Sequence, residues 1–278
     1  MRSRRHILDS TLRDGAQTPG LCLTREQKLK IAALLDAGGA RQIEAGVPAS
    51  SRREKETIAR IVENRKNAAI SVWGRLVPSD IAHAIDCRPD VIHVSAPVSH
   101  THIHARLGKD EAWVIGRLRV CLGLIGKSGA TPSVGLEDAF RGEPRFMEAV
   151  ADTLLDFGVK RVRISDTVGV ALPGAVREVL TRLSSRLGDG AVLGFHAHND
   201  LGMAVANTVE AAKHGCLYAD VTAGGIGERA GNCDLARLVA ASSDIFDWGM
   251  TEAAAFKLQR DILETLRPEN AWLPDAVP

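Results

Sequence analysis

Short apolar runs alternate with longer amphipathic stretches along the whole chain, and this alternation constrains the fold more than any other feature. The apolar runs recur about every 30 residues, which is the length of one strand–helix unit. Strands that alternate with helices form a parallel sheet. Eight such units within about 245 residues favour a closed (β/α)8 TIM barrel over an open sheet. The eight predicted strands are 6–10, 42–45, 69–73, 91–95, 133–136, 161–165, 192–196 and 219–222.

The same pattern predicts a single-domain α/β protein with little chain after the barrel. We expect the (β/α)8 catalytic barrel over residues 1–250 and a C-terminal helix and tail over 251–278. The last twelve residues contain three prolines, which favours a tail rather than a helix. The predicted helices are 25–37, 52–64, 79–86, 111–127, 145–157, 174–187, 203–214, 234–246 and 251–266.

The charge balance excludes several classes of protein. Lys and Arg total 35 and Asp and Glu total 34, so the chain lacks the basic excess that nucleic-acid binding requires. The longest apolar run, near 120–126, is far shorter than the roughly 18 residues of a membrane span. No long apolar segment follows the basic start, and five cysteines are too few for a disulfide framework. We therefore expect a cytoplasmic protein that binds neither nucleic acid nor membrane.

Polar residues follow most of the predicted strands, at the end of a barrel where active sites form. His196 and His198 are two residues apart, so in an extended strand their imidazoles point to the same side. Asp14 follows the first strand, which is a near neighbour of the seventh in a ring of eight. Two imidazoles and a carboxylate can hold a divalent cation such as Mg, Mn, Zn or Co and leave positions for substrate. The alternative is a pair of histidines that only hydrogen-bond within a loop.

Three further side chains at these strand ends are candidate site residues. Arg13 would stabilise an oxyanion or bind a carboxylate if it lies beside a metal, although an isolated arginine usually forms a surface ion pair. Glu44 would support the metal or accept a hydrogen bond from Arg13, or would only cap the next helix. Thr167 would donate its hydroxyl to a substrate carboxylate, or would only form a turn after Asp166.

The histidines of the segment 99–104 suggest a second metal site, but no carboxylate cluster accompanies them. We expect His102 to contact substrate instead.

Six motifs together resemble one family. They are DSTLRDGAQ at 9–17, EAG at 44–46, ED at 137–138, DTVG at 166–169, HAHNDLG at 196–202 and GERAGN at 227–232. The chain is similar to the metal-dependent barrel acyltransferases and lyases, which include homocitrate, isopropylmalate and citramalate synthases and 3-hydroxy-3-methylglutaryl-CoA lyase. The loop at 227–232 resembles the synthases rather than the lyase. Segments 93–99 and 107–113 are similar to homocitrate synthases associated with nitrogen fixation.

The resemblance implies a metal-dependent condensation of acetyl-CoA with a 2-oxo acid, with 2-oxoglutarate giving homocitrate. It implies that Asp14, His196 and His198 are metal ligands, and that Asn232 is a further contact either to the metal or to its ligands. It implies that Arg13 and Thr167 hold the 2-oxo acid, that Gln17 and Glu44 line the site, and that Glu137 assists proton transfer.

The resembled synthases continue into a subdomain that supplies a catalytic histidine and tyrosine, usually to a neighbouring subunit. The single tyrosine here, Tyr218, begins the eighth predicted strand, at the opposite end from the site. We therefore expect a homo-oligomer, or a hetero-oligomer in which a partner chain supplies the missing subdomain. The alternatives are a carbon–carbon lyase or aldolase, an isopropylmalate or citramalate synthase-like enzyme, a non-catalytic paralogue and a two-histidine iron oxygenase.

Overall fold

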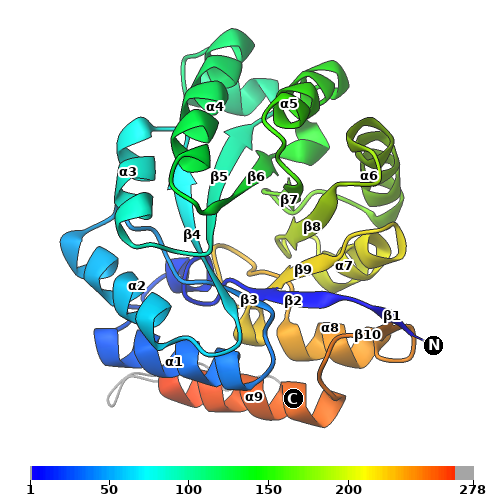
Figure 1. The fold of residues 1–278 in the computed structure, drawn as a ribbon. Helices are drawn as coiled ribbons and strands as arrows, with labels where there is room; N and C mark the ends of the chain where they lie inside the picture. Colours follow the sequence, from blue (N-terminus) through cyan, green and yellow to red (C-terminus); the bar gives the residue numbers. More distant parts are fainter. Residues whose placement is uncertain (1, 267–278) are drawn as a thin grey trace.

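The computed structural model describes residues 2–266, and eight parallel strands close into a barrel (Figure 1). Each strand pairs with the next along the chain, and β9 pairs with β2 to close the ring. The predicted (β/α)8 barrel is therefore confirmed. Its strands are β2 (His6–Asp9), β3 (Gln42–Glu44), β4 (Ala69–Arg75), β5 (Val91–Pro97), β6 (Thr131–Glu137), β7 (Arg161–Asp166), β8 (Val192–Ala197) and β9 (Tyr218–Val221).

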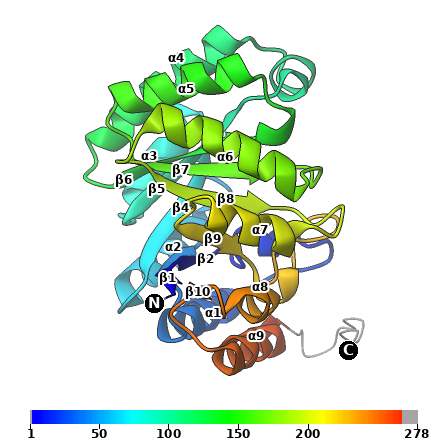
Figure 2. The same cartoon turned by 90° about the vertical axis from the view of Figure 1, so that its right-hand side faces the viewer.

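Helices cover the outside of the barrel, as the two perpendicular views show (Figure 2). They are α1 (Arg25–Ala37), α2 (Arg52–Asn64), α3 (Pro78–Asp86), α4 (Glu111–Gly126), α5 (Pro144–Asp156), α6 (Pro173–Leu187), α7 (Ala204–Lys213), α8 (Leu235–Ser242) and α9 (Glu252–Leu266). Short helical turns lie in four of the loops after the strands: η1 (Gly15–Gln17), η2 (Thr101–Arg106), η3 (Ala139–Arg141) and η4 (Ala223–Gly225). None of the helices within residues 2–266 is long and apolar enough to cross a bilayer.

The structure differs from the prediction at the start of the chain and after α8. β1 (Ser3–Arg4) pairs with β10 (Phe246–Asp247), and neither strand was predicted. The predicted helix 234–246 ends early because Phe246 is buried and belongs to this strand pair. α9 packs against α1 and α8, and the amide nitrogen of Gln27 donates to the carbonyl of Thr265 at 2.9 Å. The predicted tail, 267–278, lies outside the described residues, and the domain division stays a prediction.

The apolar core lies between the strands and the helices, whereas the interior of the barrel is largely polar. Arg163 in β7 reaches Glu44 in β3, which stands opposite it in the ring of strands. These two side chains therefore point inward, and their strand neighbours Ile43 and Ile164, which are fully buried, point outward to the helices. A polar interior can hold charged groups near the site.

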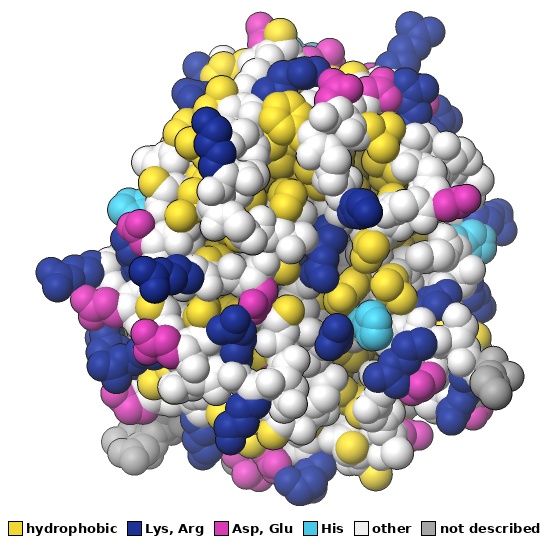
Figure 3. Space-filling model, viewed as in Figure 1, with side chains coloured by type: hydrophobic (Ala, Val, Ile, Leu, Met, Phe, Trp, Pro, Cys, Tyr) yellow, Lys and Arg dark blue, Asp and Glu magenta, His cyan; other side chains and the backbone are white. Residues whose placement is uncertain are grey.

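The surface carries mixed charge. On the face shown in Figure 3, basic and acidic side chains are interspersed around the rim, with apolar side chains between them. This arrangement matches the near balance of acidic and basic residues in the sequence.

A buried aspartate ties the end of α1 to the start of β4. The carboxylate of Asp36 accepts hydrogen bonds from the backbone N–H groups of Lys66, Asn67 and Ala68, at 2.8, 2.8 and 2.5 Å. Burial alone would raise the pKa of Asp36, but these donors outweigh it and lower the pKa below its ordinary value.

We predict that Asp36→Ala lowers the free energy of unfolding by about 2 kcal/mol, because three backbone N–H donors, one of them in the buried residue Ala68, lose their acceptor. Urea denaturation would measure the loss. Asp189→Ala is the control, since Asp189 is exposed and its side chain makes no hydrogen bond or ion pair within the part of the chain that the structure describes. Because the folded pKa is lowered, the contribution of Asp36 is present above the ordinary pKa of an aspartate and is lost as the pH falls through the folded value. Equal stability of the Ala variant and the wild type at neutral pH would contradict this role.

Candidate functional site

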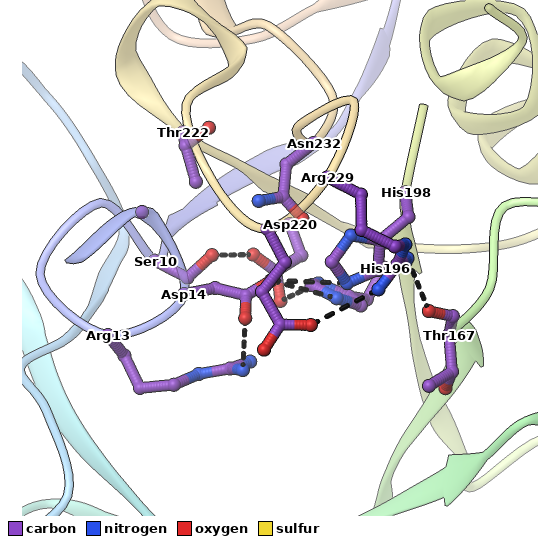
Figure 4. A network of polar contacts seen from close by, with 12 residues as sticks. Ser10, Arg13, Asp14, Thr167, His196, His198, Asp220, Thr222, Arg229 and Asn232 are labelled. Atoms are coloured by element: carbon purple, nitrogen blue, oxygen red, sulfur yellow. Dashed lines mark hydrogen bonds and ion pairs between the residues drawn. The ribbon is translucent and has the colours of Figure 1, made fainter. Parts of the chain in front are cut away.

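Asp14, His196 and His198 meet at the carboxyl end of the barrel (Figure 4). The Oδ2 atom of Asp14 lies 3.3 Å from Nε2 of His196 and 3.4 Å from Nε2 of His198. All three side chains are buried, and their ligand atoms lie within 4.8 Å of one another. Within residues 2–266, this is the only group of three or more His, Cys, Asp or Glu side chains with such spacing. The histidines of 99–104 do not form one.

Six side chains of alternating charge form a closed ring, and two of them, Asp14 and His196, also belong to this cluster. The ion pairs are Arg13–Asp14 at 2.8 Å, Asp14–His196 at 3.3 Å, His196–Asp220 at 3.0 Å, Asp220–Arg163 at 2.7 Å, Arg163–Glu44 at 3.0 Å and Glu44–Arg13 at 2.5 Å. All six side chains are at least nine-tenths buried. We call this set the charge ring.

The charge ring sets the ionisation of its members. Burial alone would lower the pKa of His196, but the carboxylates of Asp220 and Asp14 outweigh it and raise the pKa to about 9. Burial alone would raise the pKa of Asp14 and of Glu44, but the guanidinium of Arg13 holds both well below their usual range. Both carboxylates are therefore ionised at neutral pH.

His198 is not part of the charge ring, and its pKa shifts in the opposite direction to that of His196. Burial and the charge of His196 lower its pKa to about 4. Its imidazole is therefore neutral at neutral pH, which is the form that binds metal ions.

Two oxygen atoms at the cluster that accept no hydrogen bond fit a divalent cation. Oδ2 of Asp14 and Oδ1 of Asn232 are buried and accept no hydrogen bond within the part of the chain that is described. The amide nitrogen of Asn232 donates to the carbonyl of Ile226 at 2.9 Å, and its backbone pairs with that of His198. The carboxylate and amide oxygens and the two imidazoles make up the N/O donor set of Mg, Mn, Zn or Co, and His196 would lose its Nε2 proton when the ion binds. Asp14, His196, His198 and Asn232 could hold such an ion.

The cluster opens onto a pocket with an empty volume of about 820 Å³, including its mouth. Seven of the ten predicted site residues line this pocket: Arg13, Asp14, Gln17, Glu137, Thr167, His196 and His198. We call it the main pocket.

Two of these residues have their hydrogen-bonding capacity partly set by the protein. The hydroxyl oxygen of Thr167 accepts from the backbone N–H of Asp138 at 2.8 Å, so its own proton is left to donate. Burial raises the pKa of the Glu137 carboxyl, which favours its protonated form.

The other three predicted residues lie beside the main pocket. Glu44 is fully buried behind Arg13 and does not line the pocket, so the hydrogen bond to Arg13 is the alternative that the structure shows. Asn232 is buried next to His198. His102 lines a neighbouring pocket, with its Nδ1 3.6 Å from Oε1 of Glu137.

Three charged residues of the site were not predicted from the sequence. Asp220 pairs with His196 across β8 and β9, and Arg163 bridges Asp220 and Glu44. Arg229 lines the main pocket, pairs with Asp200 at 2.8 Å and donates to the carbonyl of Thr167 at 2.9 Å. The feature of the sequence that could have indicated them is a charged residue inside a short apolar strand, as Asp220 is.

The cysteine beside Asn232 takes no part in this polar site. Burial raises the pKa of Cys233 to about 12, so its thiol stays protonated and packs as a small apolar group.

Comparisons with known proteins show what this chain is similar to. A family model described as HMGL-like matches residues 4–248. Homocitrate synthase subunit alpha of Clostridium pasteurianum is 37% identical over 84% of this chain and 86% of its own length. A putative (R)-citramalate synthase of Methanopyrus kandleri is 38% identical over 86% of this chain, which spans only 47% of that relative.

A solved structure shares the fold at lower identity. The HMG-CoA lyase of Bacillus subtilis superposes with a TM-score of 0.84 at 20% identity, over 95% of this chain and 94% of the lyase. The motifs, the barrel and the match over most of the chain lead to one conclusion. The chain belongs to the HMGL-like family.

Proposed function

We propose that this protein condenses acetyl-CoA with a 2-oxo acid, and that 2-oxoglutarate is the acceptor and homocitrate the product. The observation that carries the proposal is the buried Asp14–His196–His198 cluster with Arg13 beside it, in a chain whose relatives are named as synthases. In this reaction the methyl carbon of acetyl-CoA loses a proton and bonds to the keto carbon. Water then cleaves the thioester and releases CoA.

Arg13 would hold and stabilise the reacting oxygen. Its Nε donates to Glu44 and one terminal nitrogen, Nη1, donates to Asp14. The second terminal nitrogen makes no hydrogen bond to a residue in the described range and remains to donate to the oxygen of the acceptor. Because the two carboxylates hold the guanidinium in place, little reorganisation is needed when negative charge develops on that oxygen.

Thr167 and Glu137 face the same pocket with complementary roles. The free hydroxyl proton of Thr167 would bind the carboxylate of the 2-oxo acid, and Gln17 lines the same pocket. A carboxyl group with a raised pKa, such as Glu137, exchanges protons more readily near neutral pH. We therefore assign Glu137 to proton transfer.

A divalent cation held by Asp14, His196, His198 and Asn232 would supply Lewis acidity toward the keto oxygen of the acceptor. Asp220 orients His196, because its carboxylate accepts from Nδ1 and directs Nε2 toward Asp14.

We also propose that the protein acts with a second chain or a second copy that supplies further catalytic groups. Support comes from the relatives, since one is named as an alpha subunit and another extends well beyond the matched region. A cytoplasmic location stays a prediction.

We predict that Asp14→Ala abolishes stoichiometric binding of a divalent cation, because the cluster loses its only carboxylate. Titration calorimetry with Mn²⁺ would measure the loss, and Asp189→Ala is the matched control. One equivalent of Mn²⁺ bound to the Ala variant with wild-type affinity would refute the cluster as a metal site.

We predict that Asp220→Asn weakens Mn²⁺ binding by about 10- to 100-fold without abolishing it, since His196 keeps its ligand nitrogen but loses the carboxylate that orients it. The same titration measures this effect. Circular dichroism confirms that the variant is folded, and an unchanged affinity would show that Asp220 does not position His196.

We predict that Arg13→Met lowers kcat for acetyl-CoA and 2-oxoglutarate by about 100-fold or more, while Mn²⁺ still binds. Release of the CoA thiol would be followed, with the partner chain present where activity requires it. Arg13→Lys, which keeps the charge, separates loss of charge from loss of the forked geometry. Undiminished turnover of the Met variant would remove Arg13 from the mechanism.

A lyase is the competing function within the family, and it predicts release of acetyl-CoA from hydroxyacyl-CoA substrates. Turnover of such a substrate together with no condensation of any 2-oxo acid would overturn the proposal.

A further inference from the structure

A second pocket joins the main pocket at the carboxyl end of the barrel. Trp73, Ser95, Arg106 and Glu137 line both pockets, so the two spaces share a wall. The second pocket has an empty volume of about 810 Å³. We call it the side pocket. A ligand bound at the Asp14 cluster could extend into it.

The side pocket combines an apolar surface with basic groups. Leu76 and Val77 from the loop before α3, Leu107 after η2 and Trp113 in α4 contribute apolar side chains. Such walls suit the methylene groups of a substrate side chain. The polar groups of the pocket then decide how that side chain ends.

Arg106 is the only arginine lining either pocket that has no ion pair to a described residue. The other four are each paired with a carboxylate at 2.5 to 3.0 Å, and these are Arg13, Arg75, Arg163 and Arg229. Arg106 makes no side-chain hydrogen bond or ion pair within residues 2–266. Its guanidinium is therefore available to an anionic ligand where the two pockets meet.

The segment that carries Arg106 is anchored to the barrel. Arg106 is the last residue of η2, a π-helical turn, and Ile103 in the same turn is only 1% exposed. The backbone N–H of His102 donates to Oγ of Ser99 at 3.2 Å. The nearest carboxylate of the pocket, Glu137, feels the charge of Arg106 but forms its close contact with His102 instead. The backbone at Arg106 is thus anchored to the barrel, whereas its guanidinium has no ion-pair partner among the described residues.

We propose that Arg106 binds a second carboxylate, carried by the side chain of the 2-oxo acid, and that it selects dicarboxylic over monocarboxylic acceptors. This inference rests on the proposed condensation and names the class of acceptor. The 2-oxo end of the substrate lies at Arg13 and Thr167, its methylene groups lie against Trp73, and its far carboxylate meets Arg106 at the junction with the side pocket. A guanidinium and a carboxylate form a strong paired hydrogen bond, which an acceptor that ends in a methyl group lacks. Specificity is the difference between these two cases.

The test compares two acceptors of equal chain length, 2-oxoglutarate and 2-oxopentanoate, which differ only in the terminal carboxylate. We expect Arg106→Met to lower the ratio of kcat/KM for 2-oxoglutarate to that for 2-oxopentanoate at least tenfold, with the loss falling on 2-oxoglutarate. Arg106→Lys restores part of the ratio because it keeps the charge. Lys109→Met is the matched control, since Lys109 is an exposed cation beside Trp113 that lines neither pocket, and it leaves the ratio unchanged.

A ratio that stays constant in Arg106→Met would overturn the inference, whether both rates fall together or neither falls. A second readout separates this failure from failure of the proposed condensation. If the wild type condenses neither acid with acetyl-CoA even with the partner chain present, the proposed function fails. Calorimetric titration of the same two acids in the presence of Mn²⁺ then decides the role of Arg106. Weaker binding of 2-oxoglutarate alone to the Met variant supports the role, and equal weakening of both acids or no binding to the wild type rejects it.

Discussion

The ion pair between Arg163 and Glu44 crosses the barrel, and the rest of the site depends on it. A guanidinium and a carboxylate that are this deeply buried are stable only when each is paired on several sides. Arg163 also pairs with Asp220, and Glu44 also pairs with Arg13, so each of these two buried charges contacts two opposite charges. The chain of pairs closes at Asp14 and His196, which line the main pocket together with Arg13 and Arg163. The geometry of the cluster therefore depends on the ion pairs in the polar interior of the barrel.

The sequence predicted the fold well because the barrel has a strong periodic signature. The eight barrel strands and the nine helices of residues 2–266 follow from apolar runs and amphipathic stretches, whose period is set by local backbone geometry. β1 and β10 escaped prediction because each has only two residues, and their pairing joins segments from opposite ends of the barrel sequence. For the same reason the helix predicted to reach 246 ends at Ser242, since the burial of Phe246 is a tertiary effect.

The meeting of Asp14 with His196 and His198 could be predicted because it needs only two facts. Side chains two residues apart in a strand share a face, and the first and seventh strands of an eight-strand ring are near neighbours. Asp220 and Arg163 could not be placed in this way, because contacts across the barrel interior depend on the stagger of the strands and on side-chain length. Arg106 lies in a loop after β5, where no periodic pattern indicates which way a side chain extends.

The charge ring restricts how this sequence can diverge over evolutionary time. A neutral replacement at one of its six positions leaves the two opposite charges that it contacted without this partner, so that single change carries a large penalty in a buried interior. Substitutions here should therefore be accepted in linked groups, whereas the loops that shape the side pocket can vary one residue at a time. A barrel of this kind can change the acceptor that it prefers far more easily than it can change the chemistry performed on it.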